Sequence, residues 1–468
     1  MADTQLTAEY RVKEKIKAKE IFGYGFGDLA NNIVYGLVTS FATYYYTNSA
    51  GMAAAAVGTM FLVSRIFDGI SDVIMGFIID RTKTKYGKAR PWILWMAIPF
   101  AIAVVLQFAV PQSWSMTGKL VYAYITYNLL STIIYTASNQ AYGTLNVLIT
   151  DNPQDRTKLS ISRMGMAMVG VLLLNASVMP LIRVLGGGSR AWTILAAILG
   201  VISVILFVIT FLSTKERLGS EVEEEKKAEK AKAEKIPTKV ALKALFGNKY
   251  WINRIFFALV ITIATLTTSA NVYYAQYWLG NEDLTGMISI VNVLPMLVAL
   301  IFVGTINKKI GPRNTSLIGA CVMALGFLIQ LVAPASTALI LVGCGIRGFG
   351  TGLCSTLTAV MLGDTIDYGE WKSGVRTDGL VYSASTIGTK VGNGLATASL
   401  GWALAIGRYD ATLAVQSVSA LNSIKFVFTI LPLIASVLAV VLNLIYDLDK
   451  KMPQILHDLK ERKENAQA

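Results

Sequence analysis

Residues 57–79 read VGTMFLVSRIFDGISDVIMGFII, an apolar run long enough to cross a bilayer as a helix, yet it carries three charges. Asp68 and Asp72 are spaced i, i+4 and therefore share one helix face, and Arg65, three residues before Asp68, joins that face. A charged side chain at the bilayer centre costs about 3 kcal/mol even on the milder insertion scales, so such residues face a polar interior. We therefore expect this face to point into the protein.

The composition is that of a membrane protein. The chain has 468 residues, of which 54% are hydrophobic and 15% charged, and its mean hydropathy is +0.54. A soluble protein carries about 25% charged residues. The apolar runs predict an all-α membrane protein with twelve transmembrane helices, near 21–47, 53–79, 91–110, 117–149, 161–183, 191–213, 250–279, 285–306, 314–333, 336–362, 377–407 and 419–446.

The basic residues are distributed unevenly about these spans. Most of the 42 lysines and arginines lie in the two termini and in the loops after even-numbered spans. This distribution follows the positive-inside rule and predicts that both termini are cytoplasmic. The net charge of +13 is thereby explained without nucleic acid as a partner.

Few residues have the chemistry of a catalytic centre. The one histidine, His457, belongs to the predicted cytoplasmic tail, and Cys321, Cys344 and Cys354 all fall inside spans. These positions suggest neither a disulfide framework nor a zinc site. We expect a protein that is not an enzyme and that has no cofactor.

The spans divide into two halves. A polar stretch, STKERLGSEVEEEKKAEKAKAEKIPTK (213–239), separates spans six and seven, and pairs such as Glu223 and Lys227 favour an exposed helix. The loops GFIIDRTKTKYGKAR (76–90) and GTINKKIGPR (304–313) echo each other between the halves. We predict bundles at 1–213 and 250–468 joined by a cytoplasmic linker, 214–249, which is either a solvated connection or a regulatory tether.

Three segments in the same order carry a family resemblance: FGYGFGDLANNIVYG (22–36), SRIFDGISDVIMGFIIDRTKTKYGKARP (64–91) and GDTIDYGEWKSGVRTDGLVYS (363–383). The chain resembles the glycoside–pentoside–hexuronide:cation symporters, the melibiose permease family of the major facilitator superfamily. The resemblance implies two pseudo-symmetric six-helix bundles with a substrate site between them. It also implies symport of a sugar or glycoside with H⁺ or Na⁺, a bacterial inner membrane location and a monomer.

The resemblance places a cation site in the opening stretch. Asp68 and Asp72 match the family's cation-site pair, and Thr136 offers a further oxygen. Two carboxylates suit Na⁺, for which they would be the metal ligands, or share a proton. The other interpretations are that Asp68 only neutralises Arg65 and that Thr136 makes an ordinary interhelical hydrogen bond.

Other matched residues form the expected sugar site. Asp28 matches the family's sugar-binding aspartate, Tyr35 a nearby aromatic residue, and Arg163 an arginine that reaches the sugar. A carboxylate accepts hydrogen bonds from sugar hydroxyls, and the glycines around Asp28 allow a ring to approach. The alternatives are an interhelical salt bridge for Asp28 and a membrane-surface anchor for Arg163.

Span four departs from melibiose permease. Asn139 stands where that permease has an aspartate, and Gly143 where it has a tryptophan against the sugar. Both departures resemble the glucuronide and xyloside carriers and favour H⁺ slightly over Na⁺. Lys390, deep in span eleven, matches a family lysine near both sites, and it either contacts the substrate or pairs with Asp68 or Asp72.

Charged residues at the cytoplasmic span ends suggest a gate, which we expect to include Asp80, Arg81, Arg90, Asp364 and Asp367. Arg347, in a glycine-rich part of span ten, is consistent with either close packing or a substrate-facing cavity. Two aromatic clusters, Tyr273–Tyr274 and Tyr277–Trp278, lie near the predicted outer face of span seven, where an aromatic belt is expected.

Two other functions compete with sugar symport. A drug exporter of the same superfamily would tend to have a more apolar cavity with fewer fixed carboxylates. A non-transporting sugar sensor would need a sizeable cytoplasmic signalling domain, for which neither terminus of this sequence has room.

Overall fold

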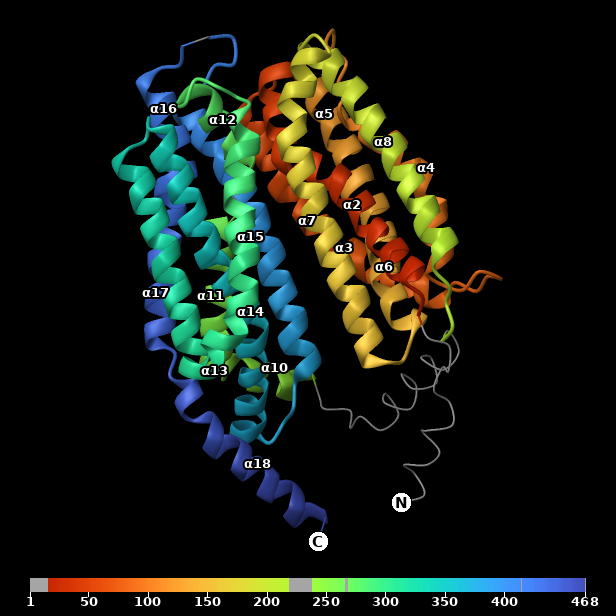
Figure 1. The fold of residues 1–468 in the computed structure, drawn as a ribbon, viewed down its shortest axis with the longest axis vertical. Coiled ribbons are helices and arrows are strands. Elements are labelled where there is room, and N and C mark those ends of the chain that lie inside the picture. Colours follow the sequence, from red (N-terminus) through yellow and green to blue (C-terminus); the bar gives the residue numbers. More distant parts are fainter. Residues whose placement is uncertain (1–15, 219–237, 266–267, 414, 468) are drawn as a thin grey trace. The chain divides into compact units, whose positions relative to one another are not determined.

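The structure, a computed structural model, describes residues 16–218, 238–265, 268–413 and 415–467. Nearly all of these residues are helical, and the chain divides into two compact units, Met1–Glu234 and Lys235–Ala468 (Figure 1). The all-α prediction is therefore confirmed. The narrower bundle limits, 1–213 and 250–468, stay predictions, and most of the linker, 219–237 with its Glu223–Lys227 pair, lies outside the described residues.

Unit 1 is a bundle in which α2 packs against α7 and α8, and α4 packs against α6 and α8. Short π-helical segments continue two of its spans, one after α2 and one between α5 and α6. Its helices are α2 (Ala18–Tyr44), η1 (Tyr45–Ser49), α3 (Ala54–Arg81), α4 (Arg90–Gln107), α5 (Met116–Asn128), η2 (Leu129–Tyr135), α6 (Thr136–Ile149), α7 (Pro153–Val184) and α8 (Gly188–Ser213).

Unit 2 is built around α13 and α14, and α11 packs against α15 and α17. The long α13 is two helices in sequence, because Gly311 has φ 80° and ψ 166° and Pro312 follows it. The elements are α10 (Thr238–Phe246), α11 (Lys249–Thr265), α12 (Thr268–Tyr277), α13 (Leu284–Val332), α14 (Thr337–Ser373), α15 (Asp378–Ile406), α16 (Val418–Lys425), η3 (Phe426–Ile430), α17 (Leu431–Ile445), η4 (Leu448–Lys450) and α18 (Met452–Gln467).

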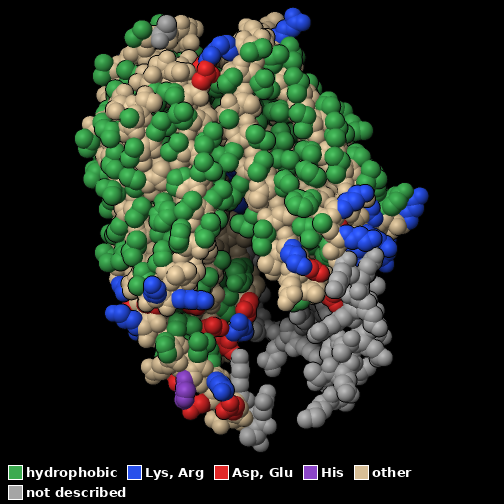
Figure 2. Space-filling view, in the orientation of Figure 1, with side chains coloured by type: hydrophobic (Ala, Val, Ile, Leu, Met, Phe, Trp, Pro, Cys, Tyr) green, Lys and Arg blue, Asp and Glu red, His purple; other side chains and the backbone are tan. Residues whose placement is uncertain are grey.

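Twelve groups of described helices fall on the twelve predicted spans when α13 counts as two and α11 and α12, like helices joined by a π segment, count as one. The helices α10, η4 and α18 lie outside the predicted spans. By length and composition alone, seven described helices are apolar enough to cross a membrane. The helix α3 carries Arg65, Asp68 and Asp72 within its apolar run. On the face in Figure 2, hydrophobic side chains cover the flanks of both units, as a lipid-facing surface requires.

Glycines allow α14 to lie close to both arms of α13. Toward the second arm, a Cβ on Gly343 would lie 2.7 Å from the carbonyl oxygen of Gly326, and one on Gly350 would lie 2.5 Å from that of Gly319. Toward the first arm, a Cβ on Gly348 would collide with the carbonyl group of Asn292. Real Cβ atoms do not come this near to backbone, so side chains larger than hydrogen would separate these helices.

We predict that Gly350→Ala lowers the stability of the protein by about 1–3 kcal/mol, because the new methyl group overpacks the contact with α13. Thermal unfolding of the detergent-solubilised protein measures the loss. Gly363→Ala, in the same helix, is the matched control, since a Cβ there has open space and alanine favours a helix. Equal unfolding temperatures for the two variants would contradict the close-packing account.

Candidate functional site

A cavity of about 440 Å³ in unit 1 brings two of the predicted sugar-binding residues together. Asp28 of α2 is 7% exposed, and Nε of Arg163, on α7, lies 3.4 Å from its Oδ2. The interhelical ion pair considered for Asp28 is thus present, and both partners also face the cavity. Its lining consists of Asp28, Ser160, Arg163, Met164, Ala167 and Met168.

The glycines before Asp28 explain why this residue can lie so close to α6 and α7. A Cβ on Gly25 would collide with Ser162 of α7, and one on Gly27 would lie 2.5 Å from Cε2 of Tyr142 on α6. The small residues Gly25 and Gly27 therefore let α6 and α7 approach α2 next to the Asp28 carboxylate. Burial of that carboxylate is offset by the guanidinium opposite it.

Tyr35 and Asn139 lie in the same unit. The ring of Tyr35 stacks on Tyr135 with a centroid distance of 4.1 Å, and its hydroxyl oxygen accepts a hydrogen bond of 3.0 Å from Arg65. Asn139 is half-buried on α6, next to Ser138, whose hydroxyl lies 3.3 Å from Oδ1 of Asn31. Neither residue lines the cavity beside Asp28, so their contact with sugar stays a prediction.

Both oxygens of the Asp68 carboxylate have partners. Nη1 of Arg65 lies 2.9 Å from Oδ2, as the i, i+3 spacing predicts, and the hydroxyl of Thr132 donates to Oδ1 at 2.5 Å. Asp68 is 5% exposed. Charge-assisted hydrogen bonds of this kind are strong in a low-dielectric interior. They join α3 to the π-helical segment η2 of span four.

The remaining cation-site residues have different surroundings. Asp72 is half-buried, and its backbone carbonyl accepts a hydrogen bond from the side chain of Gln140. Thr136 is buried at the start of α6. Sequence reasoning missed Thr132, although the spacing of Asn128, Thr132 and Thr136 marks a polar stripe along span four. The cation role of Asp72 and Thr136 stays a prediction.

Cations inside unit 2 are surrounded differently. Arg347 is 3% exposed and its guanidinium lies between the rings of Phe327 and Phe428, 5.0 Å from each centroid, which fits the close-packing interpretation. Arg254, which the sequence analysis did not single out, is 1% exposed and lies 4.2 Å from the ring centroid of Tyr446. Lys390 is half-buried on α15, and its contact with substrate or carboxylate stays a prediction.

The aromatic-belt prediction is wrong for two tyrosines. Tyr273 and Tyr274 are fully buried in unit 2, whereas belt residues contact lipid. The hydroxyl of Tyr274 donates to the carbonyl of Pro334, and its ring stacks on Phe428. Both rings pack inside the bundle, and their position near the end of a span did not indicate this burial.

A carboxylate that sequence reasoning missed caps the start of α4 in unit 1. Glu216, after α8, accepts hydrogen bonds of 2.7–2.9 Å from the backbone amides of Lys88, Ala89 and Arg90 at the start of α4. An anion here satisfies unpaired amides and complements the helix dipole. Gly87, with φ 103°, leaves the space that the carboxylate occupies.

Three of the predicted gate residues lie around this contact. Asp80 pairs with Lys88 at 3.6 Å, Arg81 is exposed at the end of α3, and Arg90 donates to the carbonyl of Phe211. The next residue after Glu216, Arg217, adds a bidentate ion pair to Glu20 of α2. These contacts bind the segment that leaves α8 to the ends of α2 and α4.

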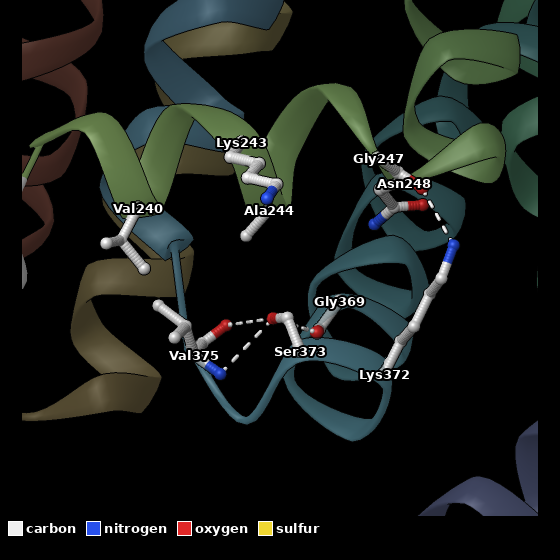
Figure 3. Close-up of a pocket in the computed structure, with 9 residues that line it drawn as sticks. All are labelled: Val240, Lys243, Ala244, Gly247, Asn248, Gly369, Lys372, Ser373 and Val375. Carbon is white, nitrogen blue, oxygen red and sulfur yellow. Dashed lines mark hydrogen bonds between the residues drawn. The ribbon is translucent and has the colours of Figure 1, made fainter.

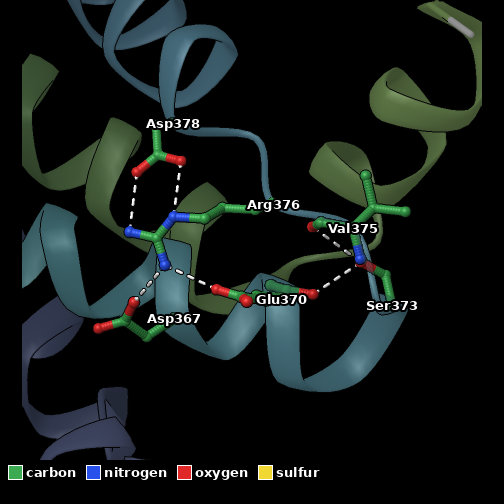
Figure 4. A network of polar contacts seen from close by, with 7 residues as sticks. Asp367, Glu370, Ser373, Val375, Arg376 and Asp378 are labelled. Carbon is green, nitrogen blue, oxygen red and sulfur yellow. Dashed lines mark hydrogen bonds and ion pairs between the residues drawn. The ribbon is translucent and has the colours of Figure 1, made fainter. Parts of the chain in front are cut away.

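At the end of α14, three carboxylates converge on one arginine (Figure 4). Arg376 lies 2.6 Å from Glu370, 2.8 Å from Asp378 and 3.1 Å from Asp367. These contacts, that to Glu370 above all, raise the pKa of Arg376 above its usual range. Asp364, the other predicted gate residue here, lies on α14 about one turn before Asp367 and is half-buried. The gating roles stay predictions.

A smaller cavity of about 260 Å³ lies where the ends of α10 and α14 meet (Figure 3). Its lining includes Lys243 and Lys372, and Nζ of Lys372 donates 2.9 Å to the carbonyl oxygen of Gly247. A cation at a helix C-terminus satisfies a free carbonyl group and complements the dipole. Lys372 therefore stabilises the end of α10.

We predict that Asp68→Asn destabilises the protein by about 3–5 kcal/mol, because it leaves the buried Arg65 without its counter-charge. Thr132→Val should cost about 1.5–3 kcal/mol through the lost hydrogen bond to the carboxylate. Asp72→Asn keeps the size of the side chain at a half-buried position and should cost less than Asp68→Asn, whose carboxylate is 5% exposed. Thermal unfolding without sugar measures the loss of stability in all three variants. A loss for Asp72→Asn as large as for Asp68→Asn would refute the special structural role of the Asp68 carboxylate.

We also predict that Glu216→Ala costs about 0.5–2 kcal/mol, since the first turn of α4 loses its capping anion. Glu216→Gln keeps an acceptor oxygen and should lose less. Unfolding temperatures measure both, with Glu461→Ala in the exposed part of α18 as the control. The capping role is excluded if Glu216→Ala unfolds at the same temperature as the control.

Comparison with known proteins connects this geometry to a family. Residues 23–450 match the family described as MFS/sugar transport protein. The chain is 38% identical to the isoprimeverose transporter of Lactiplantibacillus pentosus over 97% of its own length and 94% of that relative. It is 31% identical to the glucuronide carrier protein homolog of Escherichia coli (strain K12), with 97% and 98% covered.

A putative glycoside/cation symporter of Escherichia coli (strain K12) is also 31% identical, with 90% of each chain covered. Among solved structures, the nucleoside transporter NupG superposes with a TM-score of 0.62 over 92% of this chain and all of that one. At 12% identity, that likeness shows the fold alone, which is the predicted major facilitator fold. The nearly complete match to the family and to its relatives shows that the chain belongs to the MFS/sugar transport protein family.

Proposed function

We propose that the protein is a secondary active symporter that couples inward movement of a cation to uptake of a glycoside, pentoside or hexuronide by alternating access. The observation that carries the proposal is the pair of Asp28 and Arg163, which face one cavity in a chain of a sugar transport family. A carboxylate and a guanidinium together accept from and donate to neighbouring sugar hydroxyls.

The proposed substrate class is a pentosyl glycoside. The relative with 38% identity is named for isoprimeverose, and the cavity volume of about 440 Å³ falls in the range of small-molecule sites. Gly143 has no side chain, and Asn139 offers a neutral amide, so recognition rests on hydrogen bonds rather than on a stacking ring. Tyr35, Asn139 and Lys390 are the further proposed sugar contacts.

The proposed cation is H⁺, carried by Asp72. Both oxygens of Asp68 already have partners within unit 1, which supports a structural anion at that position. Na⁺ would need several oxygen ligands, and Thr136 supplies one. Coupling then follows from linkage, because a proton that raises sugar affinity is itself bound more tightly when sugar is present.

The proposed setting is the inner membrane of a bacterium, with both termini in the cytoplasm and one chain as the working unit. The excess of basic residues in the loops after even-numbered spans supports this orientation. Transport rather than an enzymatic reaction is the proposed activity, in agreement with the family. The bundles 1–213 and 250–468 would rock about the substrate site.

We predict that vesicles containing the protein accumulate isoprimeverose when a proton gradient is imposed, and that Asp72→Asn abolishes accumulation. Labelled glucuronides and galactosides, and a sodium gradient, are the comparison arms. Asp155→Asn, which changes a carboxylate paired with Lys158 in the first turn of α7, is the matched control and should transport normally. Accumulation driven by sodium alone would overturn the proton assignment, and no gradient-driven uptake of any sugar would overturn symport.

A further inference from the structure

We propose that Tyr142, locked in place by Tyr24, is a positioning residue that holds the Arg163 guanidinium beside Asp28 and so sets the affinity for sugar. The inference rests on the proposed function, because it concerns the same cavity. Tyr142 is not among the residues that line that cavity, so its effect is exerted through Arg163.

The two tyrosines form a reciprocal pair between α2 and α6. Their rings stack with a centroid distance of 4.5 Å and an interplanar angle of 14°. The hydroxyl of Tyr142 donates to the carbonyl oxygen of Tyr24 at 2.7 Å, and that of Tyr24 donates to the carbonyl oxygen of Tyr142 at 3.3 Å. Both side chains are fully buried. A ring restrained at its face and at its hydroxyl has little freedom to move.

Arg163 is the partly exposed side chain beside this buried tyrosine pair. Its guanidinium carbon lies 5.1 Å from the centroid of the Tyr142 ring, while Nε points to Asp28 at 3.4 Å. The side chain is 33% exposed and faces the cavity. The tyrosine ring supports one face of the guanidinium, and the carboxylate orients one of its edges.

A long arginine side chain with this much exposure would otherwise sample several rotamers. Ordering such a side chain costs conformational entropy, so a site that holds it in place binds more tightly than one that must order it on binding. The ring of Tyr142 provides that order through a cation–π contact before sugar arrives.

The space beside the guanidinium supports a recognition role for its outer edge. Among the described residues outside its own helical turn, a Cβ placed on Gly143 would have within 4 Å a single neighbour, Nη1 of Arg163 at 3.9 Å. Arg163 itself lines the cavity and its side chain is 33% exposed, so its guanidinium donors are accessible from the cavity. Sugar hydroxyls that enter there meet a guanidinium whose position the adjacent residue, Tyr142, determines.

The test compares two substitutions of the tyrosine in the full-length protein. Tyr142→Leu removes the ring and should weaken isoprimeverose binding by about 3- to 30-fold, the range expected for a lost cation–π contact. Tyr142→Phe keeps the ring and should retain most of the affinity. In an Arg163→Gln background, Tyr142→Leu should have no further effect on the dissociation constant.

A second readout needs no sugar and therefore separates this inference from the proposed function. Phenylglyoxal modifies accessible guanidinium groups, and peptide mass spectrometry reports its rate at Arg163. The rate should rise in Tyr142→Leu and stay near the wild-type value in Tyr142→Phe. Phe207→Leu, which removes another buried ring of unit 1, is the control for general loosening and should leave the rate unchanged.

The two measurements separate the positioning role of Tyr142 from the proposed substrate. If no sugar binds the wild-type protein but the phenylglyoxal rates differ as described, the positioning role stands and the proposed substrate is wrong. Equal rates at Arg163 in Tyr142→Leu and wild type, or equal losses of affinity in the Phe and Leu variants, would overturn the positioning role. If Tyr142→Leu does not fold, Tyr24→Leu removes the stacking partner instead, and the same shifts in both readouts are expected.

Discussion

Burial of charge within membrane helices is the constraint on which the arrangement of unit 1 depends. Asp68 can lie 5% exposed in α3 only because Arg65 and the hydroxyl of Thr132 occupy both of its oxygens. Arg65 also donates to Tyr35, so one ionised pair brings α2, α3 and η2 into contact. A sequence that places charges at this depth must supply all of these partners together, since any one left unpaired would cost several kcal/mol. The site geometry thus follows from an electrostatic requirement of the fold.

Glycine provides the complementary condition, because polar partners must come within hydrogen-bond distance across helices. The glycines before Asp28 let α6 and α7 approach α2, which is where the carboxylate meets Arg163. In unit 2, Gly343 and Gly350 likewise allow close helix contact, here between α14 and α13. Close helix approach therefore has two roles: it forms a polar site in unit 1 and a tightly packed helix pair in unit 2.

Sequence reasoning predicted best what local spacing determines. The apolar runs located the spans, and the i, i+3 relation of Arg65 and Asp68 offered their ion pair as one interpretation, which the structure contains. Contacts between distant segments were less accessible. Asp28 and Arg163 were expected at one site only through a family resemblance. Thr132 lies in a π-helical turn whose winding no sequence pattern indicates, and Glu216 belongs to a stretch that resembles an ordinary polar linker until its amide partners at α4 are seen.

The two units solve the problem of buried charge by different chemistry. The spans of unit 1 contain Asp28, Asp68 and Asp72, and the first two of these face an arginine. Residues 284–363 of unit 2 contain no aspartate or glutamate, and the guanidinium of Arg347 lies between two aromatic rings instead. A carboxylate can bind a proton or a hard metal cation, whereas a guanidinium is already protonated and has no acceptor atom. The membrane carboxylates on which the proposed cation coupling depends are therefore in unit 1, on the helix α2 that lines the cavity beside Asp28 or on α3, which is hydrogen-bonded to α2.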